Sequence, residues 1–186
     1  GRALREGLFP ANDPILRDAT PETVAAVSLA DVKSYHAKVF RPDMTTIVVI
    51  GKVTAKQARA AVEKYFGAWK AAGAKPVTDL PAVPPNKPSR AVVPDASRVQ
   101  DEVTLADTVG VTRSEPAYYT LELGNHVLSG AFYASRLYRD LREKAGLVYT
   151  VGSSLEAGKH RSLFRVVYGC DPPNVSKARA MVERNL

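Results

Sequence analysis

The sequence predicts an α/β sandwich of the α+β type, with a mixed, largely antiparallel sheet and helices packed on one face. Strand-length segments rich in β-branched residues are interspersed with longer segments whose apolar residues recur at helical spacing. The strand segments come in pairs, and so do the helical ones, which favours a sandwich of a mixed, largely antiparallel sheet and helices. The 186 residues, of which 45% are apolar, are enough to bury a core.

The first third of the chain predicts two helices and a strand. Thr20 precedes Pro21, and proline suits the first turn of a helix. A second helix is expected to begin after Ser28 and to end near Phe40, where Arg-Pro-Asp interrupts it. Residues 45–53 (TTIVVIGKV) are almost continuously apolar and β-branched, so we expect a central strand that is covered on both faces.

A third helix is expected to begin with the capping box Thr54-Ala-Lys-Gln57 and to end at Gly73. Its apolar residues recur at intervals of three and four, which places them on one stripe. Five prolines then occur without a period in residues 75–88. Because proline cannot donate a backbone hydrogen bond, this segment is expected to be an extended connector.

The rest of the chain predicts two strands, two helices, a β-hairpin and a last helix that Asp171 caps. That last helix has no glycine or proline stop signal, so we interpret the chain as part of a longer protein, truncated at its C-terminus. These elements are expected at residues 90–93, 99–106, 116–128, 133–144, 147–155, 162–170 and from 171 onward.

Composition excludes several classes of function. The net charge is +7, but basic residues are interleaved with acidic ones and no block of five like charges occurs. A basic nucleic-acid-binding domain is therefore a remote alternative that rests on charge alone. No apolar segment approaches the roughly 18 residues of a membrane span. The single cysteine rules out an internal disulfide and a zinc site built from cysteines.

Catalytic motifs are also missing. The three histidines are isolated, and neither His-x-x-Glu-His nor its inverted form occurs, which argues against a self-contained zinc hydrolase. Glu122 precedes His126 by four residues, yet two residues do not make a metal site. There is no nucleophile elbow and no glycine-rich phosphate loop. Cys170 is expected to be a small buried hydrophobe, although sequence leaves a catalytic thiol open.

One segment, residues 130–154, is richer in polar and aromatic side chains than its surroundings. Arg142 lies at the end of its expected helix, and a glycine turn leads into a strand that carries Tyr149. A helix-to-strand corner allows both side chains to point into one cleft. Two alternatives remain: Tyr149 as a core residue of its strand, and Arg142 as a cation at the negative end of its helix.

The segment Ser135-Arg-Leu-Tyr-Arg-Asp-Leu-Arg-Glu-Lys-Ala-Gly-Leu-Val-Tyr149 resembles the signature of the non-catalytic domain of the pitrilysin/insulinase (M16) family of zinc metallopeptidases, which includes the mitochondrial processing peptidases. Shorter segments upstream are similar to the opening of the same domain. They are Ser28-Leu-Ala-Asp-Val, Phe40-Arg-Pro-Asp, Ile47-Val-Val-Ile-Gly and Tyr65-Phe-Gly-Ala-Trp69.

The resemblance implies a domain division and a location for the metal. Residues 1–27 would be the tail of a preceding zinc-site-type domain, and residues 28–186 the non-zinc, substrate-binding domain. Zinc would belong to a catalytic half, either on the same chain or on a separate subunit. This chain would hold no cofactor and would be inactive alone. For bacterial relatives the resemblance favours a periplasmic or otherwise exported location.

The resemblance also implies roles for two residues. Arg142 and Tyr149 match an Arg/Tyr pair, seven residues apart, that reaches the active site of the catalytic half and helps to hold the substrate peptide. Tyr149 would donate a hydrogen bond in the transition state. Substrates would be unfolded or short peptides. The alternative within the family is a catalytically silent half that serves structure and assembly.

Overall fold

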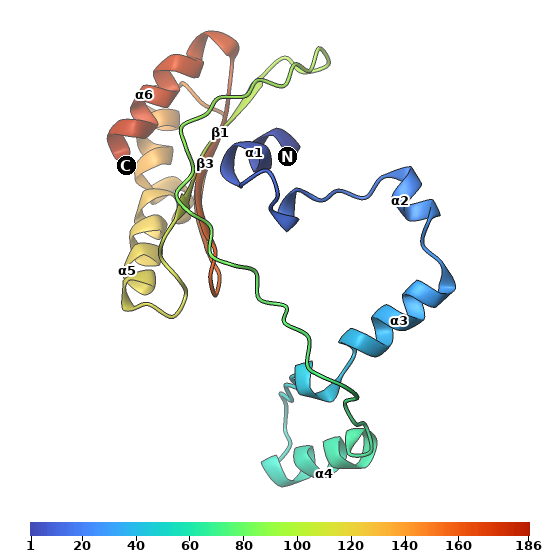
Figure 1. Ribbon diagram of the computed structural model, residues 1–186. Coiled ribbons are helices and arrows are strands. Elements are labelled where there is room, and N and C mark those ends of the chain that lie inside the picture. Colours follow the sequence, from blue (N-terminus) through green and yellow to red (C-terminus); the bar gives the residue numbers. More distant parts are fainter. The chain divides into compact units, whose positions relative to one another are not determined.

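The computed structural model describes residues 1–186 and divides into two compact units (Figure 1). The sheet unit combines residues 1–17 with residues 79–186, and the helical unit comprises residues 18–78. The predicted α+β architecture is confirmed in the sheet unit, where a single sheet is packed against helices.

The sheet has three antiparallel strands in the order β1-β3-β2. They are β1 (Asp101–Val109), β2 (Thr150–Ala157) and β3 (Ser162–Cys170). In β3 the buried side chains alternate, with Val166, Tyr168 and Cys170 fully buried. Because successive side chains of a strand point to opposite faces, this alternation places one apolar face of the central strand against the core.

Helices pack on the sheet to form that core. Figure 1 shows α5 and α6 on one side of the strands and α1 on the other. The chain from α5 to β2 is irregular, because π-helical segments (η3 and η5) and a 3₁₀ turn (η4) follow α5. The elements are α1 (Arg2–Leu8), α5 (Pro116–Asn125), η3 (His126–Gly130), η4 (Phe132–Ala134), η5 (Tyr138–Lys144) and α6 (Val175–Asn185).

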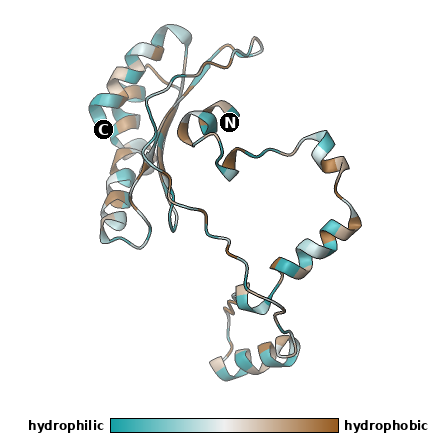
Figure 2. Ribbon diagram, viewed as in Figure 1, coloured by the Kyte–Doolittle hydropathy of each residue, from teal (hydrophilic) through white to brown (hydrophobic).

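The core lies between β3 and the helices η5 and α6. Leu141 from η5 and Val182 from α6 are fully buried together with the β3 side chains. Removing such apolar surface from water stabilises the fold by roughly 25 cal/mol per Å². Figure 2 shows hydrophobic and hydrophilic colours mixed along α5 and α6, as expected of helices with one face against a sheet.

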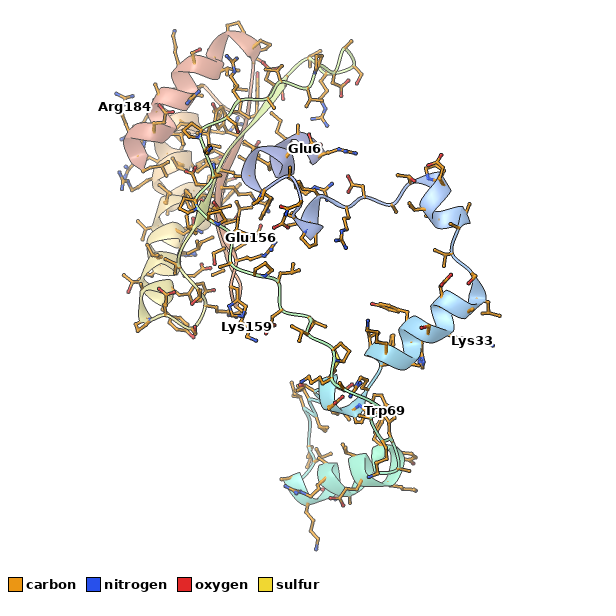
Figure 3. All side chains as sticks on the ribbon, in the orientation of Figure 1. Glu6, Lys33, Trp69, Glu156, Lys159 and Arg184 are labelled. Carbon is orange, nitrogen blue, oxygen red and sulfur yellow. The ribbon has the colours of Figure 1, made fainter.

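The β2–β3 turn binds two distant segments of the sheet unit. Arg161 donates from Nε to the carbonyl oxygen of Pro81 (2.7 Å) and from Nη1 to Oδ1 of Asp13 (2.8 Å). Lys159, labelled in Figure 3 at the tip of the hairpin, pairs with Asp79. The turn thus contacts the chain shortly before residue 18 and immediately after residue 78.

In the helical unit the capping box predicted at Thr54 is present, and the predicted helix starts at Thr20 and Ser28 have capping boxes as well. Side chains at Thr20, Ser28 and Thr54 accept the backbone N–H three residues later, and the residue at that position bonds back. These reciprocal bonds satisfy backbone donors that a helix start leaves without partners. The helices are α2 (Pro21–Ala25), α3 (Leu29–Val39) and α4 (Ala55–Phe66), with a 3₁₀ turn, η2 (Pro42–Met44), between the last two.

The buried side chain of Arg41 connects two segments of the helical unit. Its side chain is 4% exposed and makes a bidentate pair with Asp43, with both N–O distances 2.8 Å. The same guanidinium donates to the carbonyl oxygens of Ala72, Gly73 and Ala74. Arg41 therefore holds the segment that follows α4 against the segment that follows α3.

Two predicted strands are absent from the structure. Residues 45–53 contain no strand, and Val48 and Ile50 are 74% and 92% exposed. Residues 90–93 contain none either. A strand forms only where a neighbour supplies hydrogen bonds to its backbone, and the helical unit has no second strand. The prediction was wrong because an apolar, β-branched composition indicates only that a segment favours extended backbone. It does not indicate whether a neighbouring strand is present to pair with it.

Several helices and strands have bounds that differ from the predicted ones. The helix that begins after Thr54 ends at Phe66 rather than at Gly73, and the helix expected over residues 133–144 is divided into η4 and η5. The strands expected over residues 99–106 and 147–155 lie at 101–109 and 150–157. The connector over residues 75–88 holds no helix or strand, and the strand over residues 162–170 has the predicted bounds.

Candidate functional site

A glycine turn brings the end of η5 next to the start of β2. Gly146 has φ +61°, a left-handed conformation that residues with a Cβ rarely adopt. Its N–H donates to the carbonyl oxygen of Arg142 (3.2 Å), and the N–H of Leu147 donates to that of Leu141 (2.9 Å). The chain therefore reverses direction within a few residues and carries Tyr149 back toward Arg142.

The structure places Arg142 and Tyr149 side by side. The guanidinium carbon of Arg142 lies 5.9 Å from the centroid of the Tyr149 ring, within the range of a cation–π contact. Nη1 of Arg142 also donates to the carbonyl oxygen of Val148 (3.1 Å). Both side chains are exposed, Tyr149 by 47%. Tyr149 therefore lies at the surface and outside the core cluster.

Asp171 joins this pair. The Tyr149 hydroxyl donates to Oδ2 of Asp171 at 3.1 Å. This hydrogen bond and the negative charge of the carboxylate raise the pKa of the Tyr149 phenol, while Arg142 and Gln100 oppose the rise. The phenol is thus a protonated donor at neutral pH. Asp171 occupies the predicted cap position, but its side chain makes no cap hydrogen bond there.

Sequence reasoning assigned Asp171 to the final helix and missed its contact with Tyr149. The feature that brings Asp171 to Tyr149 is the pairing of the two strands, because Thr150 is opposite Gly169 in the β2–β3 ladder. The N–H of Tyr149 donates to the carbonyl oxygen of Gly169 (2.8 Å), so the residue before β2 lies beside the end of β3. That register is a tertiary feature and cannot be read from residues 147–171 alone.

A polar network holds β2 against the end of α5. The backbone N–H of Ser153 donates to Oγ of Ser129 (2.6 Å), and Oγ of Ser153 donates to Oδ1 of Asn125 (2.5 Å). Because Asn125 ends α5 and Ser129 lies in η3, the network connects this helical segment to the strand that follows Tyr149. Tyr149 is thus bonded directly to the end of β3, and the strand that follows it is bonded to α5 and η3.

The residues of this chain do not fit a zinc site. His36 stacks on Phe40 with ring centroids 4.7 Å apart, and Nε2 of His160 lies 3.9 Å from Asp79. Glu122, the candidate partner of His126, instead accepts a hydrogen bond from the Tyr118 hydroxyl (3.2 Å). No three His, Cys, Asp or Glu side chains are grouped as a metal site requires.

The single thiol is a core residue, as predicted. Cys170 is fully buried in the core cluster. Burial raises the pKa of its thiol, and the negative charges of Asp101 and Asp171 add to the rise. A thiol in this environment stays protonated and is a poor nucleophile.

An apolar groove of about 660 Å³ lies in the helical unit, between α4 and the segment that precedes it. Ile47, Val49, Phe66 and Trp69 are among its lining residues, whereas Arg142 and Tyr149 are not. Measured by length and hydropathy, none of the helices qualifies as a membrane span.

Comparison with known proteins gives consistent matches. The family model described as the peptidase M16 inactive domain matches residues 26–186. An uncharacterized zinc protease of Streptomyces coelicolor is 28% identical over 173 residues, which cover 87% of this chain and 35% of that protein. A protein of Bacillus subtilis named a probable inactive metalloprotease is 25% identical over 178 residues, 92% of this chain and 39% of its own length.

Solved structures share the fold. The peptidase M16 inactive domain from Pseudomonas fluorescens superposes with a TM-score of 0.81 at 22% identity, covering 98% of this chain and 44% of that one. The periplasmic protease PqqL from Escherichia coli gives a TM-score of 0.75 at 18% identity, covering 99% of this chain and 20% of that one. The chain spans about a third of the length of the curated relatives that it matches.

Proposed function

Because this chain belongs to the peptidase M16 family, as a non-catalytic domain of the zinc-protease type, we propose that it binds substrate for a zinc-bearing catalytic half. The observation that carries the proposal is the contact between Arg142 and Tyr149 at an exposed corner. In this proposal the pair faces the active site of the other half during peptide hydrolysis.

The chemistry of the two side chains supports this role. An extended peptide offers backbone carbonyl oxygens and a terminal carboxylate, which the planar fork of Arg142 suits. Hydrolysis of a peptide bond develops negative charge on the carbonyl oxygen. A phenol donor at that oxygen stabilises the transition state more than the ground state and thus lowers the barrier. In this proposal the peptide carbonyl oxygen replaces Asp171 as the acceptor of the Tyr149 hydrogen bond.

The division of the chain follows from the same proposal. In this division residues 1–27 are the end of a zinc-site-type domain, of which residues 1–17 pack in the sheet unit, and residues 28–186 are the substrate-binding domain. The metal would be held by the catalytic half, since the histidines of this chain are dispersed. That half is fused to this chain or pairs with it as a subunit. Unfolded or short peptides are the expected substrates.

The proposal is tested by reconstitution. Hydrolysis of a quenched fluorescent peptide should require both this chain and a zinc-bearing half, and neither should hydrolyse it alone. The double variant Arg142→Ala/Tyr149→Phe should still assemble with the zinc-bearing half, as measured by size-exclusion chromatography, but lose most turnover. Full turnover by the double variant would contradict the proposed substrate-binding role.

A second candidate is a silent half that serves assembly only. The Bacillus subtilis relative, named a probable inactive metalloprotease, favours this reading. The same reconstitution separates the two candidates. A silent half would be needed for assembly, and its Arg142 and Tyr149 variants would leave turnover unchanged.

A further inference from the structure

Three aromatic side chains meet at the surface where η4 leads into η5. The rings of Phe132, Tyr133 and Tyr138 contact one another, with centroids 4.3 Å apart for the first two and 5.0 Å apart for the other pairs. Phe132 and Tyr133 are nevertheless 59% and 64% exposed. We propose that this aromatic cluster binds a large apolar side chain of the peptide substrate. The inference rests on the proposed function and specifies the class of substrate for it.

The backbone of Phe132 is strained. Its φ is +40°, and Phe132 is the only residue other than glycine with a positive φ. A residue with a Cβ enters this left-handed region at a cost that the rest of the structure has to offset, whereas glycine enters it freely. Because the ring is exposed, burial offsets little of that cost. The fold itself thus gives no reason for phenylalanine at this position, which points to a use of the ring in binding.

Contacts on both sides hold the strained turn in one conformation. The N–H of Ala131 donates to the carbonyl oxygen of His126 (3.1 Å), and a Cβ on Gly130 would lie only 2.6 Å from Nδ1 of His126. The buried Ser135 donates from its N–H (3.1 Å) and its Oγ (2.6 Å) to the carbonyl oxygen of Phe132. The exposed rings are therefore presented on an ordered turn, which reduces the entropy lost when a ligand binds.

The aromatic cluster is continuous with the Arg142–Tyr149 pair through η5. Tyr138 is the first residue of η5, and Arg142 follows four residues later. Side chains at this spacing are neighbours on one face of a helix. An extended peptide advances about 3.3 Å per residue, so its backbone can reach Arg142 while one of its side chains reaches the rings.

The charge beside the aromatic cluster favours an apolar occupant. A lysine or arginine side chain of the peptide would meet the like charge of the Arg142 guanidinium. A phenylalanine or leucine side chain is not repelled, and it removes its own apolar surface and that of the rings from water.

The inference is tested by peptide preference in the complete peptidase. Quenched fluorescent peptides carry one phenylalanine, moved through the positions on either side of the scissile bond, with alanine at the others. At one position phenylalanine should raise kcat/KM about tenfold over alanine. Phe132→Ala/Tyr133→Ala should remove this preference and leave kcat/KM for the all-alanine peptide nearly unchanged. Tyr119→Ala is the matched control, because Tyr119 is 70% exposed and also contacts another ring, that of Tyr118 (5.1 Å).

A second variant separates binding from folding. Phe132→Gly removes the ring and the strain together, so it should reduce the preference without lowering the melting temperature of this chain. Retention of the full preference by both variants would overturn the inference. So would a stronger preference for lysine than for phenylalanine at the same position, because the rings would then bind a cation.

The remaining outcomes separate this inference from the proposed function. If Phe132→Gly prevents assembly with the zinc-bearing half in size-exclusion chromatography, the aromatic cluster is an interface and the inference fails. If Tyr149→Phe lowers turnover but no position prefers phenylalanine, the inference fails and the proposed function stands. If the complete protein hydrolyses none of the peptides, both fail.

Discussion

Arg161 and Asp13, 148 residues apart in the sequence, form an ion pair with Nη1 and Oδ1 at 2.8 Å. Their side chains are 15% and 6% exposed. Asp13 also accepts the N–H of Ile15, and the second amino nitrogen of Arg161 is buried without a hydrogen-bond partner. The N-terminal segment of the sheet unit is thus attached to the β2–β3 turn by a pair that is almost wholly out of water.

Asp13→Ala is expected to destabilise the sheet unit by about 3 kcal/mol, because it leaves the Arg161 guanidinium buried and unpaired. Urea denaturation followed by circular dichroism measures this loss. Asp140→Ala is the matched control, since Asp140 pairs with Arg139 and Lys144, both largely exposed, at the surface. Equal losses for the two variants would show that the Asp13 pair is not held out of water.

The same pair predicts a dependence of stability on acid. The hydrogen bond from Arg161 holds the pKa of Asp13 below its ordinary 3.8. A carboxyl with a lowered folded-state pKa contributes stability above its unfolded pKa and loses it as the pH falls through the folded value. When the pH is lowered from 5, the free energy of unfolding should therefore fall further in wild type than in Asp13→Asn. Parallel losses would contradict the assignment.

Tyr149→Phe keeps the ring and removes one donor. In the complete peptidase it should lower kcat by roughly 10²-fold, the usual effect of one such donor, with a smaller change in KM. The melting temperature should change little, since the hydroxyl is at the surface. Tyr119→Phe, 70% exposed on α5, is the control and should keep full turnover. Intact turnover with a melting temperature several degrees lower would instead make Tyr149 a structural residue.

Arg142→Lys keeps the positive charge but loses the planar fork. Because two parallel hydrogen bonds require that fork, kcat/KM for peptides should fall. Arg136→Lys, at an exposed residue six positions earlier in the chain, should leave kcat/KM unaltered. If both variants matched wild type, charge alone would be sufficient at residue 142.

Metal content gives a prediction for the chain by itself. Purified residues 1–186 should retain no stoichiometric zinc after dialysis and should not cleave peptides, because the histidines and carboxylates are not grouped. Elemental analysis by mass spectrometry measures the zinc. One tightly held zinc per chain would contradict the geometry found for His36, His126 and His160.

Features written in a few neighbouring residues were predictable. The helix start after Ser28, the capping box at Thr54 and the bounds of β3 are local, because the side chains that define them lie within one turn or one strand. The corner that joins Arg142 to Tyr149 was also predictable, since Gly146 marks the turn. The catalytic use of the pair stays a prediction.

Features that need a distant partner were not predictable. Residues 45–53 have the composition of a central strand, but nothing in their own sequence supplies the neighbour to which a strand bonds. Asp171 has the position of a helix cap, yet it bonds to a tyrosine 22 residues earlier. Neither the missing strand nor the Asp171 contact follows from local propensity, because each is determined by which other segment of the chain lies next to these residues.

The contacts of the β2–β3 turn have a consequence for how the chain tolerates changes in length. Arg161 binds Asp13 and Pro81, so the chain leaves the sheet unit and returns to it beside one turn. Topologically, residues 18–78 are a closed loop whose two ends are already joined. The entropy of closing a loop grows only logarithmically, by about 0.6 kcal/mol for each doubling of its length. Insertions and deletions within residues 18–78 are therefore thermodynamically inexpensive for the sheet that carries Arg142 and Tyr149.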